Sequence, residues 1–213
     1  MIPYASRTGT LRNLAALRGA GWRLLVSATG RHNAHGFPYA VDNGAWTAHQ
    51  QGKPFDVQAF ELVVAELGAG ADFVVAPDIV AGGLASLELS VSWLERLGGL
   101  RRVLIPVQDG MRPADLRPLI SDRIGLFLGG STEWKLETMR LWGRLARELD
   151  AYYHVGRVNS QKRIRLCQEA GAHSFDGTSA TRFAVKLPVL DAAVRQGHLD
   201  LLGSSDEGKG IDD

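Results

Sequence analysis

The chain has 213 residues, an apolar fraction of 45%, a charged fraction of 22% and a formal net charge of +1. These values are typical of a globular domain and exclude a collagen, a coiled coil or a mainly disordered chain. We expect neither a membrane span nor a secretory signal, because no apolar run reaches about 18 residues and the first residues are polar. The single cysteine, Cys167, leaves no internal disulfide or multi-cysteine zinc site, so we expect no metal, no cofactor and a cytoplasmic location.

Eight short runs rich in β-branched and aromatic residues follow one another along the chain. Most of them are continuously apolar, which is typical of parallel strands that are buried on both faces. They lie at residues 2–6, 21–28, 39–46, 72–78, 102–110, 124–130, 151–157 and 173–179.

Amphipathic segments separate most of these runs and predict helices. Thr10 is expected to cap the first helix, Ser131 and Thr132 to open a later one, and Asn159 or Ser160 to cap the next. The apolar stripes of the expected helices are Leu11, Leu14 and Leu17; Phe60, Val63, Val64 and Leu67; Leu87, Val91 and Leu94; Leu141, Leu145 and Leu149; Ile164 and Leu166; and residues 188–201.

This alternation predicts a compact (β/α)₈ barrel over residues 1–202, followed by a disordered polar tail at residues 203–213. Residues 29–38, between the second and third strands, are too few for a crossover helix, so one helix of the barrel is expected to be missing. An open doubly wound sheet is the alternative.

Polar residues collect at the C-terminal ends of the predicted strands, where barrel enzymes build their active sites. Each carboxylate alone fits a helix N-cap or an Asx-turn, but three of them together with Gln108 are harder to explain as structure. The residues at these positions are Asp42, Asn43, Asp78, Gln108, Asp109, Gly129, Gly130, His154, Arg157 and Asp176.

These segments, taken in order, resemble the tRNA-guanine transglycosylase superfamily over residues 42–182. The Asp-Asn-Gly-Ala-Trp segment at 42–46 resembles the family's Asp-Ser-Gly-Gly-Phe-Gln, and Phe-Asp-Gly-Thr-Ser-Ala-Thr-Arg at 175–182 resembles its Phe-Asp-Cys-Val-Leu-Pro-Thr-Arg. The other similar segments are residues 76–79, 107–110, 129–133 and 152–157. The family's zinc subdomain, with three cysteines and one histidine, has no counterpart in this sequence.

The resemblance implies a pentosyltransferase that exchanges guanine in a nucleic acid for another base. Without the zinc subdomain, the chain looks most like the phage and bacterial relatives that place a 7-deazaguanine base in DNA. We therefore expect DNA as partner in preference to tRNA, a free 7-deazaguanine base as the small-molecule substrate, and a bacterial or phage-encoded protein.

The residue types fit this chemistry. Asp176 is the expected nucleophile toward the sugar, and Asp42 the group that moves protons on and off the bases. Asp78 is expected to accept the N–H groups of a guanine-like base, while O6 of the base would accept from the Gln108 amide and from the backbone of Gly129 and Gly130. Further base contacts are expected from Asn43, His154, Trp46 and Tyr153, the last two as aromatic stacking partners.

Basic residues near the same strand ends are candidates for binding the phosphodiester backbone. They are Arg157, Lys162, Arg163, Arg165 and Arg182. For Lys162, Arg163 and Arg165, a solvated helix face is an equally good explanation. Four alternatives to base exchange in DNA stay open: exchange in tRNA, a glycosylase that lets water resolve the intermediate, a barrel isomerase that binds phosphate at residues 129–132, and a nucleic-acid-binding barrel without catalysis. Cys167 is expected to be buried and inert.

Overall fold

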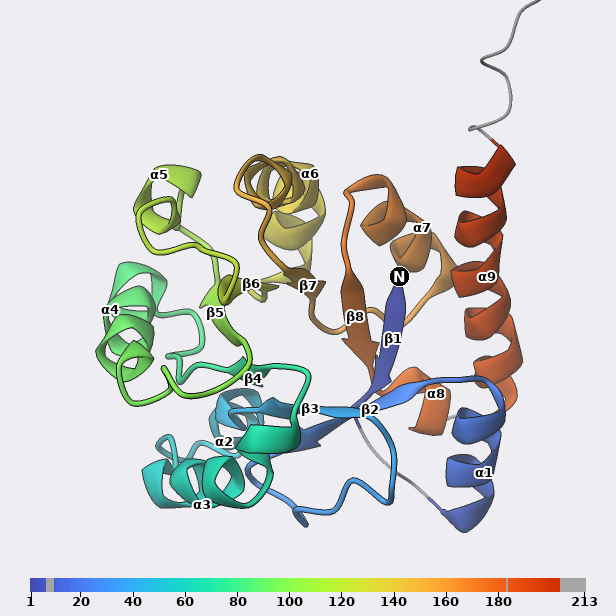
Figure 1. Ribbon diagram of the computed structural model, residues 1–213, viewed down its shortest axis with the longest axis horizontal. Coiled ribbons are helices and arrows are strands. Elements are labelled where there is room, and N and C mark those ends of the chain that lie inside the picture. The colour runs from blue at the N-terminus through green and yellow to red at the C-terminus, as the bar shows by residue number, and fades with distance from the viewer. Residues whose placement is uncertain (7–9, 183, 204–213) are drawn as a thin grey trace, which may run out of the picture.

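A computed structural model describes residues 1–6, 10–182 and 184–203. Eight parallel strands form a closed barrel in chain order (Figure 1), and β1 closes it by pairing with β8 from Ile2–Ser174 to Ala5–Gly177. The predicted (β/α)₈ barrel is thus confirmed, and the open sheet is wrong. The strands are β1 (Ile2–Ala5), β2 (Arg23–Ser27), β3 (Tyr39–Asp42), β4 (Val74–Val75), β5 (Val103–Val107), β6 (Ile124–Leu128), β7 (Tyr153–Val155) and β8 (Ser174–Gly177).

The helices lie outside the barrel (Figure 1), and the longer ones bury apolar side chains on their inner faces. The longer ones are α1 (Leu11–Gly19), α3 (Val57–Leu67), α4 (Gly83–Leu94), α6 (Thr132–Glu148), α7 (Gln161–Glu169) and α9 (Leu187–Gly203). The shorter ones are α2 (Ala45–Gln50), α5 (Pro113–Leu116), α8 (Ser179–Arg182) and the 3₁₀ turns η1 (Gly68–Gly70) and η2 (Ala184–Lys186). Thr10, Ser131 and Ser160 cap α1, α6 and α7 as predicted, each accepting a backbone N–H in the first turn.

No crossover helix joins β2 to β3, as the short linker predicts. The third strand, however, ends at Asp42 instead of continuing to Trp46. Gly44 takes a left-handed φ of 80°, and the chain turns there into α2. A Cβ on Gly44 would lie 2.8 Å from Cγ2 of Thr29, so this turn also packs tightly against the end of β2.

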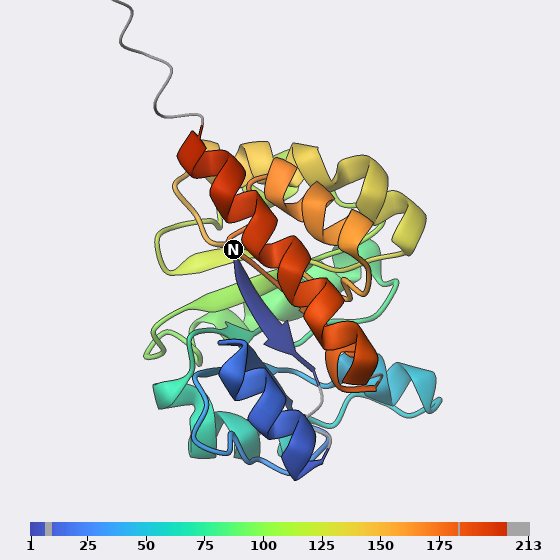
Figure 2. The same ribbon diagram turned by 90° about the vertical axis from the view of Figure 1, so that its right-hand side faces the viewer.

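Figure 2 shows α9 running along the outside of the molecule, with α7 alongside it. The Gln168 side chain joins the two helices by donating to the carbonyl of Val194 at 3.1 Å. Gly203 is the last residue of α9, and the rest of the predicted tail lies outside the described residues. No helix in the described ranges is long and apolar enough to cross a membrane. Cys167 is buried in α7, as predicted.

The barrel interior is aromatic where the later strands meet. The His154 ring stacks on Phe127 with centroids 4.8 Å apart, and Phe73 and Tyr4 pack within 5.1 and 5.9 Å of the same ring. These rings close the barrel beneath the C-terminal strand ends and form the floor on which the site described next is built.

Candidate active site

A cavity of about 650 Å³ opens at the C-terminal ends of the strands. This volume lies in the range of small-molecule sites. Ten of the residues expected at the site line it, namely Asp42, Asn43, Trp46, Asp78, Gln108, Gly129, Gly130, Arg157, Asp176 and Arg182. The structure therefore gathers residues from both halves of the chain into one mouth of the barrel.

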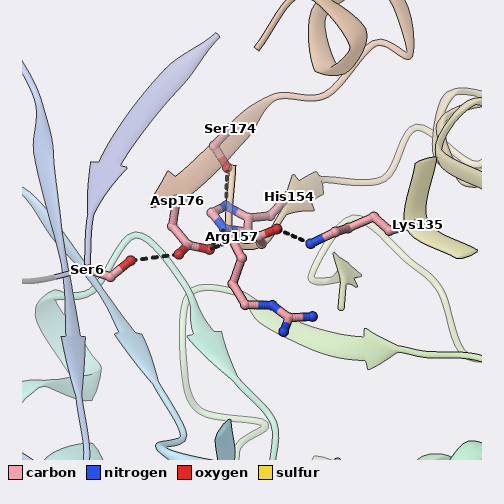
Figure 3. A network of polar contacts seen from close by, with 7 residues as sticks. Ser6, Lys135, His154, Arg157, Ser174 and Asp176 are labelled. Atoms are coloured by element: carbon pink, nitrogen blue, oxygen red, sulfur yellow. Dashed lines mark hydrogen bonds and ion pairs between the residues drawn. The ribbon is translucent and has the colours of Figure 1, made fainter. Parts of the chain in front are cut away.

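Asp176 lies at the base of this cavity on β8 and is 4% exposed. Its Oδ1 accepts from Ser6 Oγ at 2.6 Å, while Oδ2 lies 3.1 Å from His154 Nε2 and accepts from the Arg157 backbone N–H at 3.2 Å (Figure 3). Burial acts to raise the pKa of Asp176, but the His154 and Ser6 contacts bring that pKa below its ordinary value. Asp176 is therefore held as a carboxylate.

His154 does not line the cavity, because its side chain is fully buried beneath it. Nδ1 of His154 lies 2.7 Å from Ser174 Oγ (Figure 3). Burial lowers the pKa of His154, which favours the neutral ring. A neutral ring donates from Nε2 to Asp176 and accepts from the Ser174 hydroxyl. His154 thus supports Asp176 and is not a direct base contact, which corrects the sequence-based expectation.

Asp42 ends β3 on the same cavity. Burial, followed by the charge of Asp176, raises the pKa of Asp42 to about 7. The backbone N–H of Gly44 donates to Oδ2 of Asp42 at 3.1 Å. Asp42 can consequently take up or release a proton near neutral pH, whereas Asp176 stays ionised.

Asp78 is held between two side-chain amides. Asn43 Nδ2 donates to Asp78 Oδ1 at 2.8 Å and to the Ala76 carbonyl at 2.6 Å, and Gln108 Nε2 donates to Asp78 Oδ2. Burial raises the pKa of Asp78 to about 6 in spite of these donors. Asn43 is therefore a support for Asp78 more than a separate contact.

The expected donors to O6 of a base need correction. Gln108 uses its amide N–H groups on Asp78 and on Ser86 Oγ, so the donors face away from a ligand, while its buried Oε1 has no hydrogen-bond partner in the described chain. The N–H of Gly129 donates to the Val107 carbonyl at 2.9 Å. Gly130 also lines the cavity, and within the described residues its N–H makes no hydrogen bond, so this N–H is left as the candidate donor.

Tyr153 was expected to stack on the base, and the structure places it elsewhere. Its side chain is fully buried between β7 and α6, and its hydroxyl donates to the Met139 carbonyl at 2.9 Å. Neighbouring strand residues point to opposite faces, so with His154 inside the barrel Tyr153 must point to the helices.

Of the two expected stacking partners, Trp46 remains at the mouth, where it is 39% exposed. The guanidinium carbon of Arg157 lies 4.1 Å from the Trp46 ring centroid, and Arg157 also donates to the Gly130 carbonyl. Arg157, which follows β7 with a left-handed φ of 58°, therefore reaches across the mouth to α2.

The basic candidates divide by position. Arg182 lines the cavity from α8, whereas Lys162 and Arg165 are exposed on α7 and Arg163 is half-buried there, all outside the cavity lining. Asp109 occupies the N-terminus of α6, accepting from Ser131 N at 2.7 Å and from Ser131 Oγ at 2.6 Å. A carboxylate already fills the place where a phosphate would bind, which argues against the phosphate-binding alternative.

Sequence reasoning missed Ser6 and Lys135. Ser6 follows β1 beside β8, and only barrel closure brings it to Asp176. Lys135 is a buried lysine on α6, which a helical charge pattern does not distinguish from a surface lysine. In the described ranges, no three His, Cys, Asp or Glu side chains are arranged to hold a metal ion.

Comparison of the sequence with protein-family models and with curated proteins gave no match. Comparison of the fold gave a match to a chain of tryptophan synthase from M. tuberculosis, in an open form with the compound BRD0059 bound. The two are 15% identical, with a TM-score of 0.52 over 92% of this chain and 91% of that chain. This likeness shows the barrel fold alone.

Proposed function

We propose that this barrel is a base-exchange enzyme that replaces guanine in a nucleic acid, DNA in preference to tRNA, by a 7-deazaguanine-type base. The observation that carries the proposal is a pair of aspartates in one cavity with opposite protonation preferences. Asp176 is held ionised by its donors, and the pKa of Asp42 is raised to about 7. Such a pair is what retaining glycosyl transfer requires.

In the proposed reaction a carboxylate oxygen of Asp176 bonds to C1′ of the nucleotide as the C1′–N9 bond breaks. Oδ1 suits this role better than Oδ2, because it accepts one hydrogen bond and Oδ2 two. The departing base takes a proton from Asp42. The incoming base then returns a proton from its own ring nitrogen to Asp42 and attacks C1′, which releases Asp176.

Base recognition would use the cavity groups that can still contact a ligand. Asp78 can accept two N–H groups of the base, with its orientation held by Asn43 and Gln108. The Gly130 N–H can donate to O6, and Trp46 offers a face for stacking. Arg182 at the rim would contact the phosphodiester backbone.

The test is to incubate the protein with radiolabelled guanine and either DNA or tRNA and to measure label in the polymer. A denaturing gel detects the covalent adduct. We expect labelled DNA, and Asp176→Asn should form neither product nor adduct. Asp56→Asn is the matched control, because Asp56 only caps α3 and asparagine caps equally well.

Label in tRNA alone would correct the substrate, and release of guanine without exchange would make the protein a glycosylase. Wild-type protein that gives no label, no released base and no adduct would contradict the proposal.

A further inference from the structure

Lys135 is a buried amine that the proposed reaction does not use. It lies on the inner face of α6 and is 3% exposed. Its Nζ donates to the Gly156 carbonyl oxygen at 2.5 Å (Figure 3). It makes no ion pair with a carboxylate of the described chain.

This position is costly for a lysine. Burial lowers the pKa of Lys135 to about 8, yet the amine remains largely charged at pH 7. A buried charge without an ion pair costs desolvation free energy, which its remaining contacts must offset. The interaction that the lysine makes therefore needs an explanation other than packing.

The hydrogen-bonded carbonyl belongs to the peptide that also serves Asp176. The oxygen of the Gly156–Arg157 peptide accepts from Lys135, and the N–H of the same peptide donates to Asp176 Oδ2 at 3.2 Å. One peptide group thus lies between an ammonium and a carboxylate, with its dipole aligned to favour both charges.

The backbone at this point is strained and needs support to hold that orientation. Arg157 has a φ of 58°, in the left-handed region that is unfavourable for residues other than glycine. A Cβ on Gly156 would lie 2.8 Å from the Phe127 ring and 3.4 Å from Asp176 Oδ2, so the peptide is also pressed closely against the site. A tether on its carbonyl keeps the N–H directed at Asp176.

We propose that Lys135 is a positioning residue for Asp176, acting through the Gly156–Arg157 peptide, and this rests on the proposed function only in taking Asp176 as the reacting group. The charge of Lys135 is also among the causes that lower the pKa of Asp176. The other groups that act on Asp176 are His154 and Ser6, with Asp42 coupled across the cavity, while Arg157, Arg163 and Cys167 act on Lys135.

The first experiment is a double-mutant cycle in urea unfolding and needs no activity. Lys135→Met should destabilise the wild type and should destabilise Asp176→Asn much less, with a coupling of about tenfold in the folding equilibrium constant. Lys162→Met, an exposed lysine on α7, should show no coupling with Asp176→Asn. Additive effects within about twofold for Lys135 would overturn the proposal.

If Lys135→Met does not fold, the measurement becomes whether a second substitution restores folding. The Lys135→Met, Asp176→Asn double variant should then fold, because the carboxylate that lost its support is gone. A double variant that is equally unfolded overturns the proposal.

The second experiment uses the pH profile of adduct formation. Lys135→Gln keeps a donor for the Gly156 carbonyl but removes the charge, so its acid limb should move to higher pH while its plateau rate stays near that of the wild type. Lys135→Met should show the same shift and a lower plateau. An acid limb that does not move in either variant would overturn the proposed role of Lys135 in positioning Asp176. If the wild type forms no adduct while Lys135 and Asp176 remain coupled in unfolding, the result would instead count against base exchange.

Discussion

Asp42 and Asp176 share one cavity, yet their surroundings favour opposite protonation states. Asp176 receives hydrogen bonds from Ser6 Oγ and the Arg157 N–H and lies beside His154, and these lower its pKa. Asp42 is desolvated and faces the charge of Asp176, which raises its pKa to about 7. The difference arises from the number of donors at each carboxylate, since both are aspartates at strand ends.

Asp42→Asn should change stability and activity in different pH ranges. Because the folded pKa of Asp42 is raised, its contribution to stability is fully present below about pH 4 and is lost as the pH rises through about 7. The variant should therefore have a free energy of unfolding on the order of 4 kcal/mol above that of the wild type at pH 8, with little difference at pH 4. Urea unfolding at both pH values measures this.

In the exchange assay Asp42→Asn should be slower by about 10²–10⁴-fold while still forming some adduct, because the proton from Asp42 accelerates departure of the base whereas Asp176 supplies the covalent bond. A variant that loses stability at pH 8 would contradict the raised pKa. Adduct that survives in Asp176→Asn and vanishes in Asp42→Asn would reverse the two roles.

At the scale of elements, α6 and α7 approach each other closely at Gly143. A Cβ there would lie 1.9 Å from the Ala170 carbonyl oxygen at the end of α7. Both helices carry parts of the site, since α6 holds Lys135 and α7 follows the loop of Arg157. The Gly143 contact therefore sets how closely the two helices approach at this point.

Gly143→Ala should force α6 away from α7 and lower the free energy of unfolding by about 1–3 kcal/mol, despite the higher helix propensity of alanine. Gly99→Ala is the control, because a Cβ at Gly99 would meet no atom within 4 Å. Thermal unfolding of both variants measures the difference. Equal melting temperatures for the two would show that the α6–α7 contact can relax.

At the scale of the whole molecule, the strands that carry the site also close the barrel. Asp176 lies on β8, which pairs with both β1 and β7, and Asp42 lies on β3, which pairs with β2 and β4. Because one barrel joins these strands, a ligand at the mouth is expected to stabilise the entire fold.

Guanine or a 7-deazaguanine base at about 100 times its dissociation constant should stabilise the protein by about 2.7 kcal/mol and raise the melting temperature by several degrees. A pyrimidine at the same concentration should not. Asp78→Asn should lose the effect, because an amide then replaces one acceptor of the base N–H groups. A melting temperature unchanged by any purine would remove the base-binding interpretation of the cavity.

The sequence by itself determined the barrel, its missing crossover helix and ten of the residues that line the cavity. Continuous apolar runs mark strands buried on both faces, and parallel strands place the polar residues that follow them at one rim. For this reason Asp42, Asp78 and Asp176 could be assigned to one mouth before their positions were known.

Only the tertiary structure decided which of these groups contact a ligand and which support one another. Side-chain direction and partners distant in sequence decided these contacts. Tyr153 points outward, and the Gln108 amide donates to Asp78. Asp176 meets Ser6 and His154. Lys135 is the clearest example: its burial against the Gly156 carbonyl arises from how α6 packs on the barrel. The local sequence pattern indicates which residue types occur along the chain. The hydrogen-bond partners, in contrast, are set by the pairing of β1 with β8 and by helix packing.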